Sequence, residues 1–292
     1  MFRTIMLVFC FAAGWFIPSL ALLKPLMPYC LIYMLTVVFM RMDLTQRVFS
    51  WRHLWVIVVN LLSAFGIWKG MLLCGIPEPF AQAAFFTTIT PTATAAPVII
   101  SLLGGSIGFA LVGFLLSALV VSCVLPIAVP LVLHQSAWTA MPLVLSRVCF
   151  VTLLPAVLAG LLRLCFKQRA QQWGKRLTPS TLYAWMALVA IIAASASDFI
   201  DASGEYFTRA DILWVLVIDL LICIFSFGVG ALLGIGGHAR ECSQLLGQKN
   251  TSYTTYLAFA CGAPFAALGP AFYVFFHNAW NGLQLIFHKE KN

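Results

Sequence analysis

The stretch TTITPTATAAPV, residues 87 to 98, decides how this chain folds, because it is polar and unfavourable to a helix although long apolar runs flank it. Pro91 and Pro97 each remove a backbone donor and crowd the preceding helical turn. The hydroxyls that can satisfy the freed carbonyls belong to Thr88, Thr90, Thr92 and Thr94. We therefore predict a membrane helix that is interrupted within Thr90 to Pro97.

A second stretch of the same character, LGQKNTSYTTYL, spans residues 246 to 257. Gly247 is expected to end a helical run that begins near Arg240, and Gln248 and Lys249 follow it. Residues suited to the N-cap of a second half-helix are Asn250, Thr251 and Ser252. A helix interrupted at this depth exposes a negative C-terminal end and a positive N-terminal end, which can hold ions and charged substrates.

An internal repeat relates the two stretches. Residues 54–62 read LWVIVVNLL and residues 213–221 read LWVLVIDLL, so six of nine positions are identical at an offset of 159. The same offset places residues 87–98 over 246–257 and Asn60 over Asp219. We expect two halves, 1–137 and 138–292, of five membrane spans each. Because five is odd, the second half must run inverted in the membrane.

Composition assigns the chain to a membrane. Its 292 residues are 62% hydrophobic and 9% charged, with a mean hydropathy of +0.98, which a water-soluble domain could not sustain. Ten apolar segments are centred near residues 13, 33, 64, 90, 120, 153, 189, 224, 251 and 276. The prediction is an all-α integral membrane protein of ten transmembrane helices. Nine singly placed cysteines favour neither a disulfide framework nor a metal site, and no cofactor is expected.

The basic residues indicate an orientation. If the ten segments cross in alternation, four basic residues fall on one side: Lys24, Lys69, Arg147 and Arg209. Twelve fall on the other: Arg3, Arg41, Arg47, Arg52, Arg163, Lys167, Arg169, Lys175, Arg176, Arg240, Lys289 and Lys291. The positive-inside rule then places both termini in the cytoplasm and the chain in the cell (inner or plasma) membrane. The net charge of +8 favours contact with the anionic lipid bilayer, and no aromatic-interleaved basic patch suggests nucleic acid.

Three motifs resemble those of the bile acid:sodium symporter (BASS) family of membrane transporters. They are TPTATAAPVIISLLGGSIGFAL (90–111), GQKNTS (247–252) and GPAFYVFFHN (269–278). The resemblance implies a core domain of helices three to five and eight to ten, in which helices four and nine cross at their breaks. It also implies a panel domain of helices one, two, six and seven. Substrate would bind in the cleft between the two domains, as a small organic anion that is bile-acid-like or another carboxylate.

The chain departs from the family where sodium binds. In the fourth span, sodium-binding members resemble TASN, whereas the last two positions of this motif are Ala96 and Pro97 in this chain. In the ninth span they resemble E-x-G-x-Q-N, whereas this chain has Leu245 in place of the acid and Lys249 in place of the glutamine. The resemblance implies that sodium ligands are missing. We expect the Lys249 ammonium to take the place of the ion beside half-helix carbonyls.

Lys249 has two interpretations. A lysine at bilayer depth costs roughly 2.5 to 3.5 kcal/mol on insertion scales, and it usually marks function. A structural lysine that snorkels or pairs is the alternative. Its nearest expected charge partner is Asp219, either in a structural ion pair or with a role of its own in transport, and Asn60 is the repeat counterpart of Asp219. In the tenth span, His277 is expected to satisfy loosened backbone or to line the cleft, and Asn278 resembles the asparagine of the family.

Two classes of function remain at this point. The first is a secondary transporter, not an enzyme, that moves a small organic anion by alternating access. The candidate binding residues are Thr90, Thr92, Thr94, Pro97, Gln248, Lys249, Asn250, Thr251, Ser252 and Asn278. We expect this transport to be independent of sodium at the Lys249 site, with the proton as a second candidate coupling ion because burial favours the neutral lysine. The alternative is a membrane-embedded enzyme that uses Asp219, His277 or Ser106.

Overall fold

In a computed structural model, which describes residues 2–42, 48–203 and 207–289, the chain forms helices and one isolated antiparallel backbone bridge. The first half contains α1 (Phe2–Phe16), η1 (Pro18–Leu26), α2 (Met27–Arg41), α3 (Trp51–Leu73), α4 (Glu78–Ile89), α5 (Ala96–Leu102) and α6 (Ile107–Val132). The second half contains α7 (Ala137–Val148), η2 (Cys149–Leu153), α8 (Leu154–Phe166), α9 (Gln168–Ser203), α10 (Arg209–Leu233), α11 (Ala239–Gly247), α12 (Thr251–Ala260) and α13 (Pro264–Lys289). Arg47 and Lys291, counted above among the basic residues, lie outside the described ranges.

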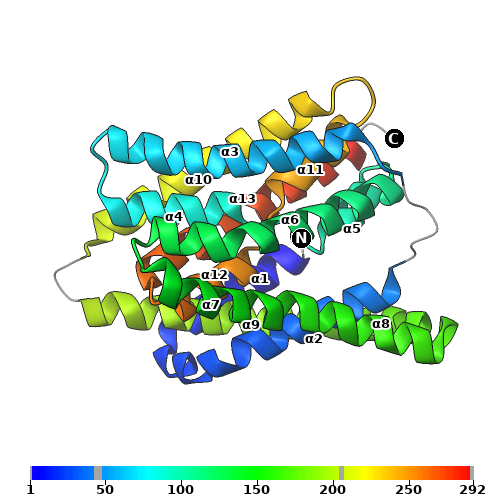
Figure 1. Ribbon diagram of the computed structural model, residues 1–292, viewed down its shortest axis with the longest axis horizontal. Helices are drawn as coiled ribbons and strands as arrows, with labels where there is room; N and C mark the ends of the chain where they lie inside the picture. Colours follow the sequence, from blue (N-terminus) through cyan, green and yellow to red (C-terminus); the bar gives the residue numbers. More distant parts are fainter. Residues whose placement is uncertain (1, 43–47, 204–206, 290–292) are drawn as a thin grey trace.

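The helices run mostly along the long axis of the molecule, so that the connections gather at its two ends (Figure 1). The turns from α3 to α4 and from α6 to α7 lie at one end, and the junction of α8 with α9 lies at the other. Such an arrangement suits a bundle that crosses a membrane along this axis, because backbone polar groups are then satisfied within each helix.

The apolar character expected from the sequence is confirmed in part. Within the described residues, six helical segments are long and apolar enough to span a membrane by length and composition. They are Pro18–Arg41, Trp51–Leu73, Ile107–Val132, Trp138–Phe166, Gln168–Ala202 and Ala210–Leu233. The other expected centres, near 13, 90, 251 and 276, fall in α1, in the first interruption described below, at the start of α12 and in α13. These elements are either too short or too polar to be recognised by length and hydropathy alone.

Local sequence explains where several helices begin. Ser50 caps α3 in a capping box, because its hydroxyl accepts from the Arg52 N–H while His53 Nδ1 accepts from the Ser50 N–H. Thr208 and Asp211 form the equivalent box at the start of α10. α3 and α10, which carry the repeated sequence, therefore begin with the same local chemistry.

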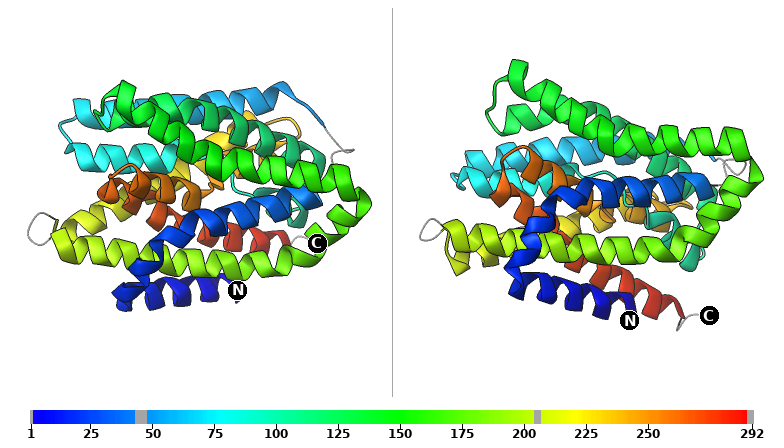
Figure 2. Two further views of the ribbon diagram at one scale, coloured as in Figure 1. Left: turned by 60° about the horizontal axis from the view of Figure 1, so that its bottom comes forward. Right: turned by 90° about the horizontal axis from the view of Figure 1, so that it is seen from below.

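The helices pack in two sets, with α12 in contact with both. In the first set, α9 lies along α1 and α2, and α2 also contacts α8. Figure 2 shows α1, α2 and α9 side by side. In the second set, α10 contacts α11 and α13, while α4 contacts α3 and α13. α12 contacts α13 and α4 on one side and α2, α7 and α9 on the other. Its first turn therefore lies where the two sets meet.

Candidate functional site

Both helix interruptions predicted from the sequence are confirmed. α4 ends at Ile89 and α5 begins at Ala96, so the first break covers Thr90 to Ala95. Pro91 ends α4 because it has no N–H to donate to the carbonyl of Thr87. α11 ends at Gly247 and α12 begins at Thr251, so the second break covers Gln248 to Asn250. Each break separates two short helices that would otherwise form one continuous span.

The two breaks meet and are joined by backbone hydrogen bonds. Thr92 and Lys249 form the isolated antiparallel bridge. The Ala93 N–H donates to the Gln248 carbonyl at 2.8 Å, and the Asn250 N–H donates to the Pro91 carbonyl at 2.8 Å. The breaks thereby satisfy part of the backbone that neither helix can satisfy alone. The prediction that the two interruptions approach each other is confirmed.

Lys249 lies at the C-terminal end of α4. Its Nζ donates to the backbone carbonyl of Thr88 at 2.8 Å and to Asn60 Oδ1 at 2.6 Å. Asn60 in turn donates its Nδ2 to the carbonyl of Ile89 at 3.3 Å. The side chain of Lys249 is almost fully buried, with 2% of the residue exposed. The negative end of the α4 dipole and two hydrogen-bond acceptors therefore stabilise the ammonium group.

Neutral donors occupy the C-terminal end of α11. The Tyr273 hydroxyl donates to the Gly247 carbonyl at 2.7 Å, and the Thr92 hydroxyl donates to the Leu245 carbonyl at 2.6 Å. Gly247 is required by packing, because a Cβ at this position would lie 2.4 Å from the ring of Phe227 on α10. The ends of α4 and α11 are thus both satisfied by side chains of the chain itself.

The expected ion pair between Asp219 and Lys249 is not formed in the described part of the chain. Asp219 is fully buried on α10, where its Oδ1 accepts from the Thr87 hydroxyl at 2.9 Å and its Oδ2 has no hydrogen-bond partner. The partner of Lys249 is instead Asn60, the repeat counterpart of Asp219. The physical reason is that Asn60 on α3 reaches the ammonium group at the end of α4, whereas Asp219 on α10 is hydrogen-bonded to Thr87.

A cavity of about 470 Å³ lies beside the crossing, between the two sets of helices. From the breaks and α12 it is lined by Thr94, Gln248, Asn250, Thr251 and Ser252, and from α13 by His277 and Asn278. The facing wall comes from α2 and α9 and includes Arg41, Thr178 and Trp185. Arg41 and the N-terminal end of α12 place positive charge at the wall of this cavity.

The structure separates the sequence-predicted site residues into two groups. Thr94, Gln248, Asn250, Thr251, Ser252 and Asn278 line the cavity, and Pro97 lines a neighbouring one of about 370 Å³ that shares Arg41 and Thr94. Thr90, Thr92 and Lys249 line neither cavity and hold the crossing together from within. The Thr90 hydroxyl, for example, lies 2.6 Å from that of Thr254. The first group is therefore accessible from the cavities, and the second is buried within the crossing.

Sequence reasoning missed the wall of the cavity formed by α2 and α9. Arg41 was counted only as a basic residue near the end of a helix, and it hydrogen-bonds Thr178 at 3.4 Å. A usable signal was its position directly after the apolar run of α2, where a long side chain can turn back into the bundle. The sequence did not indicate that Thr178 and Trp185 line a cavity, because the residues around them show no periodic polar face.

The residues of the enzyme alternative do not form a catalytic constellation. Ser106 caps α6 by accepting from the Phe109 N–H, and its own N–H donates to Glu241. His277 stacks edge-on against Tyr273 on the same helix. Within the described residues, no hydrogen bond or ion pair joins any two of Ser106, Asp219 and His277. In the described part of the chain, no hydrogen bond joins the Ser106 hydroxyl to a base, which nucleophilic catalysis requires.

Comparison with known proteins assigns no family. The sequence matches neither a model of a known protein family nor a curated protein. In the residues that the structure describes, no group of three histidine, cysteine or acidic side chains could hold a metal ion.

Proposed function

We propose that this protein is a secondary transporter that moves a small organic anion across the cytoplasmic membrane by alternating access. The observation that carries the proposal is the pair of broken helices that meet at a bridge beside a cavity between two sets of helices. Broken helices are unfavourable in lipid unless they line a cavity or bind a solute. Their occurrence at positions related by the 159-residue repeat supports a transport site.

The proposed architecture is ten spans in two inverted repeats, as in the BASS family that the sequence resembles. Six apolar helices, together with α1, α13 and the two broken pairs α4–α5 and α11–α12, supply the ten. The core would contain α3 to α6 and α10 to α13, and the panel would contain α1, α2, α7, α8 and α9. Both termini would then lie in the cytoplasm, on the side of Arg41 and Arg240.

The preference for an anion rests on the charges around the cavity. Arg41 lines it directly, and the first turn of α12 presents backbone N–H groups near Thr251 and Ser252. Gln248 and His277 each carry a buried polar atom without a hydrogen-bond partner, and these atoms can bind a polar solute once the cavity rearranges. Asp219 points to Thr87 and does not line the cavity. The net field therefore favours a carboxylate.

The contacts of Lys249 support the proposal that transport does not depend on sodium. A sodium ion at the end of α4 would need the Thr88 carbonyl and the Asn60 amide oxygen, and the lysine ammonium already occupies both. The charge that an ion would bring is supplied by the protonated side chain. Coupling to a proton is a second, separable proposal, because a lysine buried in this way can release its proton when the site opens to water.

Uptake of labelled carboxylates into proteoliposomes tests the proposal. We expect uptake to be unchanged when choline replaces sodium, and to fall at least about tenfold in Lys249→Gln, because the neutral amide cannot supply the charge. Lys69→Gln, on the distant part of α3, is the matched control and should retain full uptake. Uptake that requires sodium in the native chain would overturn the ion-replacement proposal, and uptake of cations alone would overturn the anion proposal.

A pH gradient separates the proton question from the rest. If protons are coupled, an imposed gradient at constant membrane potential should drive accumulation of the labelled carboxylate in the native protein. Sodium-independent uptake without accumulation would remove proton coupling and leave the ion-replacement proposal standing. Hydrolytic turnover in the absence of any uptake would favour the enzyme alternative.

A further inference from the structure

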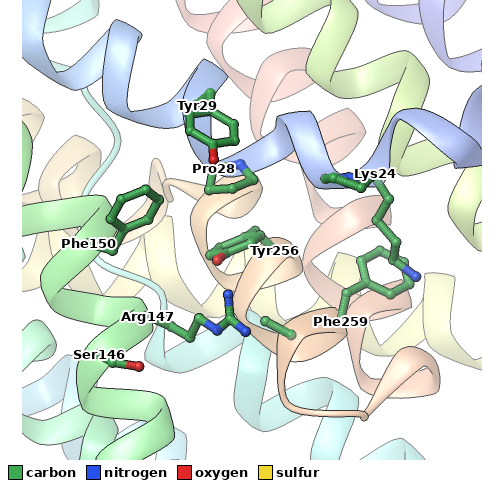
Figure 3. A pocket seen from close by; sticks show the side chains of 10 residues that line it. Lys24, Pro28, Tyr29, Ser146, Arg147, Phe150, Tyr256 and Phe259 are labelled. Carbon is green, nitrogen blue, oxygen red and sulfur yellow. The ribbon is translucent and has the colours of Figure 1, made fainter.

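A second, larger cavity of about 660 Å³ lies away from the crossing (Figure 3). Its walls come from the end of η1 and the start of α2, from α7 and η2, and from the end of α12. Its lining side chains include Lys24, Tyr29, Arg147, Phe150, Tyr256 and Phe259. We call it the vestibule. None of these residues was predicted from the sequence to bind a solute.

The vestibule and the cavity at the crossing lie along the same two helices, α2 and α12. α2 contributes Tyr29 near its start to the vestibule and Arg41 at its end to the crossing cavity. α12 contributes Tyr256 near its end to the vestibule and Thr251 at its start to the crossing cavity. Between them α2 and α12 are in contact, with Leu31 and Leu257 buried in the same apolar cluster. A solute that leaves the crossing on this side would enter the vestibule.

Arg147 is the unusual residue of the vestibule. It lies nine residues into the apolar span Trp138–Phe166, which is roughly 14 Å along the helix axis. An arginine within a membrane span is costly and marks a polar pathway or a charge partner. Within the described residues it forms no ion pair. Lys24, the other cation, is attracted by Asp198 and lies 4.0 Å from the ring centre of Phe259. Arg147 therefore supplies the uncompensated positive charge.

Tyr256 provides a second polar group. Only 7% of the residue is exposed, and it lines the vestibule. Arg147 is close enough to interact with its hydroxyl, but no described residue meets the geometry of a hydrogen bond with it. Figure 3 shows the hydroxyl on the vestibule side, between Arg147 and Tyr29. A buried hydroxyl without a partner is unfavourable, so a ligand that accepts a hydrogen bond there is stabilised.

Aromatic rings form the remaining walls. Tyr29 and Phe150 pack edge to face with their ring centres 6.0 Å apart, and Phe259 closes the side below Lys24. Aromatic side chains favour a flat ring in offset or edge-on contact. An aliphatic ligand of equal size would bury apolar surface in the vestibule but would lack these contacts between aromatic rings.

We propose that the vestibule binds a small aromatic carboxylate, with the carboxylate on Arg147 and the Tyr256 hydroxyl and the ring among Tyr29, Phe150 and Phe259. This rests on the proposed function in assigning the vestibule to the transport path, and it names the substrate class. The charge requirement comes from Arg147, and the aromatic requirement comes from the walls.

Equilibrium binding of tritiated 2-naphthoate to the purified full chain in lipid nanodiscs tests this proposal. We expect unlabelled 2-naphthoate to displace the label, 2-naphthalenemethanol and succinate to fail, and cyclohexanecarboxylate to compete several-fold less well. Arg147→Gln should weaken binding by at least about tenfold and Tyr256→Phe by about threefold or more, as expected for a charge-assisted and a neutral hydrogen bond. Arg147→Lys should recover part of the loss.

Two control variants locate the site. Arg163→Gln changes an arginine on α8 that bonds the Phe39 carbonyl outside the vestibule, and it should bind within about twofold of the native chain. Lys69→Gln should also retain binding, because Lys69 does not line the vestibule. Equal binding by Arg147→Gln and Arg163→Gln, with matching thermal stability, would overturn the proposal. So would equal competition by the neutral alcohol.

Uptake measured with the same variants separates this inference from the proposed function. Naphthoate binding that depends on Arg147, without any uptake in proteoliposomes, would support the vestibule and refute the transporter. Carboxylate uptake that is the same in Arg147→Gln and Arg163→Gln would support the transporter and refute the vestibule as its aromatic site.

Discussion

The two breaks are related by the repeat but are built with different chemistry. The first, Thr90 to Ala95, is long, contains Pro91 and carries no charge. The second, Gln248 to Asn250, is three residues long and carries Lys249, whose ammonium lies at the end of the opposite half-helix, α4. At the equivalent end of α11, neutral hydroxyl donors take this role. The comparison teaches that two breaks in corresponding stretches of sequence differ both in length and in the charge that satisfies the opposite half-helix.

The largest effect is expected from removing the charge of the second break. Lys249→Met leaves the Thr88 carbonyl and the Asn60 amide oxygen without their buried donor. We expect the free energy of unfolding to fall by about 2 to 5 kcal/mol, with uptake abolished. Unfolding in mixed micelles with a denaturing detergent measures the change.

The control for this variant is Lys69→Met, which removes a lysine that lies over the Trp68 ring on the same helix as Asn60. It should change stability by less than about 1 kcal/mol. If Lys249→Met were as stable as the native chain, the charge in the second break would not contribute to stability, and the two breaks would not differ in this respect.

A smaller effect is expected from the packing of the second break. Gly247→Ala places a methyl group 2.4 Å from the ring of Phe227, so α11 and α10 must separate or the ring must move. We expect a loss of about 1 to 3 kcal/mol and a lower melting temperature. Gly228→Ala is the matched control on α10, because a Cβ there meets no atom within 4 Å. Equal melting temperatures for the two variants would show that the close contact is unimportant.

The first break offers a milder test. Ser117 on α6 accepts the Thr92 N–H at 3.0 Å, so Ser117→Ala leaves a buried backbone donor without its partner. We expect a loss of about 1 kcal/mol. Ser63→Ala, whose hydroxyl bonds only carbonyls of its own helix, should lose less and serves as the comparison. A larger loss in Ser63→Ala would argue against the role given to Ser117.

The smallest effect is expected from replacing the acid of α10 by the amide that α3 carries at the corresponding position. Asp219→Asn makes the position identical to Asn60 and keeps an oxygen for the Thr87 hydroxyl. Because Asp219 forms no ion pair with Lys249, we expect a change within about 1 kcal/mol and no change in the ratio of uptake with and without sodium. A loss comparable to that of Lys249→Met would reinstate Asp219 as its charge partner.

The sequence predicted those features that depend on local chemistry. Pro91 and Gly247 interrupt a helix wherever they are packed, so both breaks were found at their correct positions. The partner of Lys249 was not found, because the choice between Asn60 and Asp219 depends on which neighbouring helix faces the end of α4. Arg41 and Arg147 were counted only for orientation, since a linear sequence does not show which way a side chain turns. The same holds for Tyr256, whose missing partner is visible only in three dimensions.

The backbone bridge between the breaks has a consequence for which conformations the protein can populate. Parting the breaks would remove the bonds from Ala93 to Gln248 and from Asn250 to Pro91. Each such bond contributes about 0.5 to 1.5 kcal/mol net, and a buried group that is left unpaired costs about 1 to 3 kcal/mol. A motion that keeps the breaks together avoids this cost. In any conformational cycle we therefore expect the two breaks to move as one body.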